Sequence, residues 1–189
     1  MEALITSTLL VALAEIGDKT QLLSFVLAAR LKKPVPILWG ILVATLLNHA
    51  LAAWAGILVA NAVPAAMLGW LVGISFILFG LWALKPDSLD EIPRVRNAGV
   101  FATAFVAFFL AEMGDKTQFA TVALAARFDA LAAVVLGTTL GMMIANVPAV
   151  WFGERLTKRL PMSAVRLTAA ALFVAIGLLT IWGTLYAYE

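Results

Sequence analysis

Two copies of a seven-residue motif place ionisable side chains in the middle of strongly apolar sequence. The copies occupy residues 15–21 and 112–118 and read Glu-Ile-Gly-Asp-Lys-Thr-Gln and Glu-Met-Gly-Asp-Lys-Thr-Gln. Ionisable groups are costly inside a membrane span, where they mark ion paths, proton relays or substrate sites. The candidate ligands of a divalent cation are the four acidic side chains of the motif, Glu15, Asp18, Glu112 and Asp115.

The spacing within the motif predicts that the acids of one copy lie together. Residues three apart share one face of a helix, so Glu15 and Asp18 would face the same way, flanked by Lys19. Gly17 lacks a side chain, which permits close helix approach or local unwinding of the span. If the two copies meet, four carboxylates and two lysines leave a formal charge of minus two, which a divalent cation would balance. The other polar residues of the copies are expected to support the site: Thr20, Gln21, Lys116, Thr117 and Gln118.

The available ligands indicate which metals the site would take. The chain has no cysteine and one histidine, so the ligand set is almost entirely oxygen. Ca²⁺, Mn²⁺ and Mg²⁺ accept such ligands, whereas Zn²⁺ and Cu⁺ usually require nitrogen or sulfur. Protonating the carboxylates would release the metal, so one site can carry metal and protons alternately, as an antiporter requires. We therefore expect the metal ion and protons to be transported substrates, with no cofactor.

Composition and hydropathy predict an all-α membrane protein embedded in the lipid bilayer. Of the 189 residues, 63% are hydrophobic and 13% are charged, whereas soluble domains are about half apolar and a quarter charged. The net charge is only +2, which gives no indication of nucleic-acid binding. Six apolar runs are long enough to cross a bilayer, at about residues 4–29, 35–60, 66–84, 99–126, 130–152 and 164–186.

The basic residues predict how the chain is oriented in the membrane. Ten of them lie in the gaps after the first, third and fifth runs or at the start of the sixth, whereas the other gaps contain only Arg127. Because short cytoplasmic loops are rich in Lys and Arg, we expect both termini outside and the three basic gaps in the cytoplasm.

The two halves of the chain form a repeat with an offset of 97 residues. Besides the motif, residues 27–30 match residues 124–127, and both segments read Leu-Ala-Ala-Arg. Each half holds three predicted spans, an odd number, so the halves would insert with opposite orientations, as in many secondary transporters. We expect one integrated membrane domain, formed by repeats at 1–84 and 98–189 joined by a cytoplasmic linker at 85–97. A homo-oligomer is compatible with this arrangement.

Several alternative interpretations compete with a transport site. A Glu–Lys pair four residues apart can be a buried salt bridge that only holds helices together. Asn48 and Asn146 are candidates for lining the ion path, but polar residues that hydrogen-bond neighbouring helices are equally common. For His49, which has no histidine counterpart in the second half, a hydrogen-bonded helix contact is favoured over a metal ligand.

Other functional classes are also open. A passive divalent-cation channel could use the same acids. An intramembrane enzyme or an assembly factor ranks lower, because the sequence offers no nucleophile paired with a base. We therefore do not expect an enzyme.

The doubled motif, in the first and fourth of six apolar runs, resembles the Gdt-type cation transporter family, whose pattern is Glu-x-Gly-Asp-Lys/Arg-Thr/Ser. The resemblance covers both copies and the six-span layout, and outside the motifs it is mainly one of hydropathy. It implies an inverted-repeat transporter that exchanges Mn²⁺ or Ca²⁺ for protons. It also implies that Glu15, Asp18, Glu112 and Asp115 bind the cation, with Thr20 and Thr117 as neighbours. The short chain, without a transit peptide, resembles the bacterial members, which implies Mn²⁺ export across the inner (cytoplasmic) membrane.

Overall fold

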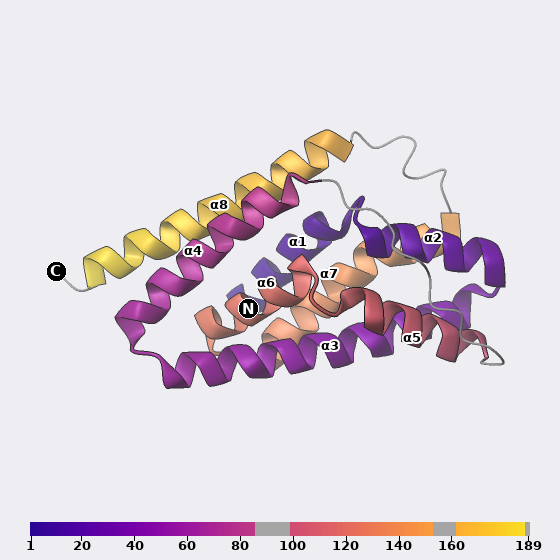
Figure 1. Ribbon diagram of the computed structural model, residues 1–189, viewed down its shortest axis with the longest axis horizontal. Coiled ribbons are helices and arrows are strands. Elements are labelled where there is room, and N and C mark those ends of the chain that lie inside the picture. The colour runs from indigo at the N-terminus through magenta and orange to yellow at the C-terminus, as the bar shows by residue number, and fades with distance from the viewer. Residues whose placement is uncertain (86–98, 153–161, 188–189) are drawn as a thin grey trace.

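The computed structural model describes residues 1–85, 99–152 and 162–187, whose regular structure is entirely helical (Figure 1). The helices are α1 (Glu2–Glu15), α2 (Lys19–Leu31), α3 (Pro34–Ala62), α4 (Ala65–Ala83), α5 (Val100–Glu112), α6 (Lys116–Phe128), α7 (Leu131–Phe152) and α8 (Met162–Ala187). The all-α prediction is thus confirmed for the described residues. The predicted linker, apart from Lys85, lies outside them, as do the basic residues between α7 and α8.

Four of the described helices are long and apolar enough to cross a membrane. They are α3, α4, α7 and residues 163–187 of α8, and each coincides with a predicted apolar run to within two residues. The runs at 4–29 and 99–126 are instead divided at the motif into the short pairs α1–α2 and α5–α6. Helices broken near the middle of the bilayer are typical of secondary transporters, where they build the substrate site.

A glycine interrupts each broken run. Gly17 has a φ of +83° and Gly114 a φ of +74°, a left-handed conformation that glycine adopts without strain and that commonly ends helices. Glu15 is therefore the last residue of α1, and Asp18 precedes the first residue of α2. The expectation that both acids share one helix face is wrong, because the chain unwinds between them. The second copy is interrupted in the same way.

Glutamine side chains replace hydrogen bonds lost at the breaks. The Gly17 amide donates to Oε1 of Gln21 at 2.9 Å, and the Gly114 amide donates to Oε1 of Gln118 at 2.7 Å. A backbone donor without an intrahelical partner must find another acceptor inside a membrane. The glutamine of the motif thus stabilises the unwound backbone that positions the acids.

One close contact between helices recurs at the offset of 97 residues. A Cβ atom built on Gly40 of α3 would lie 2.8 Å from the Phe101 carbonyl oxygen of α5. Gly137 of α7 approaches the Leu4 carbonyl oxygen of α1 in the same way, at 2.6 Å, and both pairs are related by the offset of 97. Glycine permits such close packing of helix backbones in membranes.

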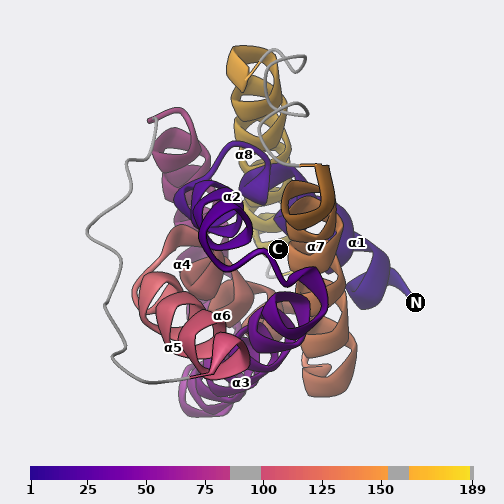
Figure 2. The ribbon, with the colours of Figure 1, turned by 90° about the vertical axis from the view of Figure 1, so that its right-hand side faces the viewer.

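Helices α4 and α8 pack against one end of the molecule and not against the other. One buried hydrophobic cluster combines residues of α1, α3, α6 and α7 with Val72 and Phe76 of α4 and Phe173 of α8. The other cluster contains residues of α2, α3, α5 and α7 and none from α4 or α8. Helices α4 and α8 run beside one another, while α2 and α5 lie together at the other end of the molecule (Figures 1 and 2). We call these ends the α1/α6 end and the α2/α5 end.

Candidate metal centre

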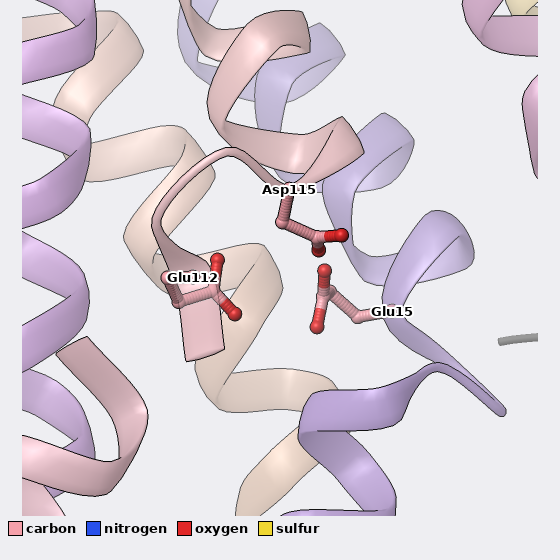
Figure 3. A group of neighbouring side chains, drawn as sticks. All are labelled: Glu15, Glu112 and Asp115. Carbon is pink, nitrogen blue, oxygen red and sulfur yellow. The ribbon is translucent and has the colours of Figure 1, made fainter. Parts of the chain in front are cut away.

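Three motif carboxylates converge where the two broken helix pairs meet. Glu15 comes from the end of α1, Glu112 from the end of α5, and Asp115 from the start of α6 (Figure 3). One oxygen of each lies within 4.8 Å of the other two. All three residues are buried, with Glu15 and Glu112 fully inaccessible to solvent. Sequence reasoning placed four acids here, and the structure brings oxygens of three of them within 4.8 Å of one another.

Asp18, the fourth acid, lies beside a lysine of the other repeat. Lys116 Nζ is 2.5 Å from Asp18 Oδ1, and Lys19 Nζ is 3.2 Å from Asp115 Oδ1. Each lysine therefore pairs with the aspartate of the opposite repeat rather than with the glutamate four residues before it. The two crossed ion pairs join the repeats at the site, whereas the alternative interpretation of the motif as a Glu–Lys pair placed both partners in one copy.

The threonine of each copy orients the glutamate of the same copy. Thr20 donates to Glu15 Oε2 at 2.5 Å, and Thr117 donates to Glu112 Oε2 at 3.2 Å. Oε1 of both glutamates is buried and has no hydrogen-bond partner among the described residues. Buried polar atoms in folded proteins nearly always have a partner, so the two unpartnered oxygens are candidates to bind a metal ion or a proton.

This donor set fits a hard or borderline divalent cation. The three candidate ligands are carboxylates, and the neighbouring threonines supply further oxygen atoms. Like charges held this close inside a protein repel one another, and a bound cation or protons would relieve the repulsion. The arrangement can therefore hold a metal ion in one state and protons in another.

The polar residues beyond the acids bond neighbouring helices. Gln21 Nε2 donates to the Ala145 carbonyl at 3.0 Å, and Ser24 Oγ donates to Asn146 Oδ1 at 2.6 Å, so that α2 is fastened to α7. Asn48 Nδ2 donates to the Phe109 carbonyl at 3.1 Å and so caps the last turn of α5. These bonds match the interpretation of the two asparagines as helix contacts.

His49 does not behave as a hydrogen-bonded contact. The residue is fully buried, and neither ring nitrogen has a hydrogen-bond partner among the described residues.

Sequence reasoning did not single out Ser24 or Arg127 as residues that bond neighbouring helices. A signal was present for both, because Ser24 aligns with Thr121 and Arg127 with Arg30 at the offset of 97.

Comparison with known proteins identifies the family of this chain. The model of the family described as "Divalent cation/proton antiporter GDT1" matches residues 3–91 and 100–187. A Vibrio cholerae protein named "Putative manganese exporter" is 49% identical over 181 residues, covering 95% of this chain and 90% of the relative.

More distant relatives carry the family name. A GDT1-like protein of Synechocystis is 27% identical, covering 96% of this chain and 98% of the relative. "GDT1-like protein 3" of Oryza sativa subsp. indica is 26% identical, covering 92% of this chain and 71% of the relative. No solved structure matches the chain. The chain belongs to the GDT1 family of divalent cation/proton antiporters and is thus a multi-pass membrane transporter, not an enzyme.

Proposed function

We propose that this protein exports Mn²⁺ from the cell across the cytoplasmic membrane in exchange for protons, with Ca²⁺ as a second substrate. The name of the Vibrio cholerae relative, together with 49% identity over nearly the whole chain, supports manganese as the substrate. The oxygen ligand set supports both metals, since Mn²⁺ and Ca²⁺ each accept carboxylates.

The proposed architecture has six spans in two inverted three-span repeats. Each broken pair, α1–α2 and α5–α6, forms one span, and α3, α4, α7 and α8 form the other four. Both termini are external, so the α1/α6 end faces outward and the α2/α5 end faces the cytoplasm. The reciprocal contacts of Gly40 and Gly137 support the two-fold relation, and the distribution of Lys and Arg supports the orientation.

Convergence of Glu15, Glu112 and Asp115 from both repeats is the observation that carries the proposal. A site built at the interface of the repeats changes shape when one repeat moves against the other, which is how inverted-repeat transporters alternate access. The cation enters from the cytoplasm, binds the three carboxylates and leaves outside. Protons then neutralise the acids while the empty site returns.

The motif lysines offset half of the formal negative charge of the empty site. Lys19 pairs with Asp115, which is itself a candidate ligand, so an arriving cation competes with the ammonium for this carboxylate. Asp18 and Lys116 join the repeats beside the ligands and complete the site. Asn48 and the two motif glutamines fix the helix ends from which the acids project, and Asn146 of α7 accepts a hydrogen bond from Ser24 of α2.

Proton flux from liposomes containing the purified protein tests this proposal. Adding Mn²⁺, and separately Ca²⁺, should move protons in the direction opposite to the metal. Asp115→Asn should abolish the flux, while the exposed Asp129→Asn serves as the matched control and should leave it intact. Metal entry without proton movement would indicate a channel, and unchanged flux in Asp115→Asn would refute the assigned site.

A further inference from the structure

We propose that Arg127 is a gating residue that holds the external side of the transporter closed. This inference rests on the proposed function for its membrane orientation, but it concerns residues outside the metal centre. Arg127 lies in the last turn of α6 and is half-buried. It is the one basic residue that the sequence places on the external side.

The guanidinium of Arg127 joins α6 to α8. Its Nη1 donates to the Thr180 hydroxyl and to the Ile176 carbonyl, the latter at 3.4 Å. Thr180 gives its own proton to the Ile176 carbonyl at 2.7 Å, so the hydroxyl oxygen is free to accept from the arginine. Hydrogen bonds to a charged donor are stronger than neutral ones, particularly where water is excluded.

One further contact and one longer-range attraction act on the arginine at the external end. Its guanidinium carbon lies 5.4 Å from the centre of the Phe128 ring, within range of a cation–π contact. The carboxylate of Glu2, at the start of α1, attracts the guanidinium from beyond ion-pair distance. Arg127 thus connects α6 with α8 and, through charge, with α1, the helices that form the external end.

The two-fold partner of Arg127 makes none of these contacts. Arg30, at the end of α2, is exposed, and the structure gives it no hydrogen bond or ion pair with any described residue. Residues Phe79 and Ala83 of α4 occupy the positions equivalent to Ile176 and Thr180, so the first repeat offers a carbonyl but no hydroxyl. The bond is therefore present at one end of the molecule and absent at the other.

Packing of the helices shows the same difference. Helix α6 packs on α4 and α1 packs on α8, and residues of α4 and α8 join the hydrophobic cluster at this end. The cluster at the α2/α5 end contains no residue of either helix. The α4–α8 pair therefore covers the external end in this structure, and the Arg127–Thr180 bond fastens it there.

Because the chain contains no cysteine, single-cysteine variants can report opening of this end. Ala123→Cys is the reporter, since Ala123 of α6 is buried and lines an apolar pocket between α6 and α4 together with Leu68 and Phe79. Asp129→Cys, exposed just beyond α6, is the orientation control. Intact cells would be treated with a membrane-impermeant maleimide, with Arg127→Gln or the matched Arg30→Gln introduced beside each reporter.

We expect Arg127→Gln to raise the labelling rate of Ala123→Cys by ~10-fold or more, the scale of a lost charge-assisted hydrogen bond. Thr180→Val, which keeps the shape of threonine, should give a smaller rise, and Arg30→Gln should give none. Equal labelling with and without Arg127 would overturn the proposal, as would an equal rise for Arg30→Gln. If Asp129→Cys reacts only from the cytoplasmic side, the orientation fails and the external assignment fails with it, whatever the transport assay shows.

Discussion

The two copies of the motif differ at one position in sequence, yet their surroundings in the structure are unequal. Around the first copy, Gln21 and Ser24 fasten α2 to α7 through Ala145 and Asn146. At the equivalent place in the second copy, Thr121 donates to the Thr117 carbonyl of its own helix. His49, which aligns with Asn146, has no hydrogen-bond partner among the described residues.

This difference teaches that the repeated residues build the candidate site, while the unequal contacts around them determine which end of the molecule is covered. Residues shared by both copies provide the acids, the breaks and the crossed ion pairs. Helices α4 and α8 then pack on the hydrophobic cluster at one end and contribute nothing to the cluster at the other end, although each repeat contributes one helix to the pair. Under the proposed orientation, the structure is closed outside, and movement of this pair would exchange the roles of the two ends.

The largest effect is expected where the copies are equivalent. Glu15→Gln and Glu112→Gln each remove one ligand charge while keeping the shape of the side chain. Each should reduce Mn²⁺ transport by more than the ~10–100-fold loss that follows removal of an outer-shell hydrogen bond in metal sites. Liposome uptake assays, with the membrane content of each variant measured in parallel, check this. Normal transport by either variant would show that the two glutamates are not equivalent ligands.

An intermediate effect should separate the two lysines. Lys116 exposes 7% of its side chain and Lys19 exposes 22%, so the Lys116–Asp18 pair is the more enclosed. Lys116→Met should destabilise the protein by about 3–5 kcal/mol, the usual cost of removing one partner from a buried ion pair. Lys19→Met should cost less and should tighten Mn²⁺ binding, since Asp115 is relieved of a competing cation.

Thermal unfolding in detergent and titration with Mn²⁺ measure both quantities for the two lysine variants. The reverse order of stability, or weaker binding of Mn²⁺ by Lys19→Met, would contradict the proposed difference between the pairs.

The smallest effect concerns the bonds between α2 and α7. Ser24→Ala removes a hydrogen bond between helices and should lower stability by about 1 kcal/mol. Thr121→Ala removes a bond within one helix and should change stability little. The melting temperatures of the two variants test this difference, and equal values would mean that the α2–α7 bond does not distinguish the repeats.

Much of the fold was predictable because hydropathy and length define membrane helices. The predicted run at 35–60 became α3, Pro34–Ala62, and the run at 130–152 became α7, Leu131–Phe152. The broken runs were harder to foresee, since the spacing of Glu15 and Asp18 also fits a continuous helix. The left-handed conformation of Gly17 rules out a continuous helix at this point. The glycine in the sequence permits that conformation but does not require it.

The site was predictable in its residues but not in its pairings. Repetition of the motif indicated that acids from both halves meet, and three of them do. Pairing of Lys19 with Asp115 depends on how the helices cross, which no spacing within one copy encodes. The bond from Arg127 to Thr180 was missed for a similar reason, because Arg30 and Arg127 occupy equivalent positions in the repeat and only the structure shows which of them lies against α8.

Locating Mn²⁺ in the protein by anomalous diffraction tests the central claim most directly. The account predicts one strong peak at the meeting point of the two motifs, in contact with carboxylate oxygens of Glu15, Glu112 and Asp115. The peak should be lost in crystals of Glu112→Gln. A manganese ion bound elsewhere, with the three carboxylates unoccupied in crystals grown at saturating Mn²⁺, would contradict the account.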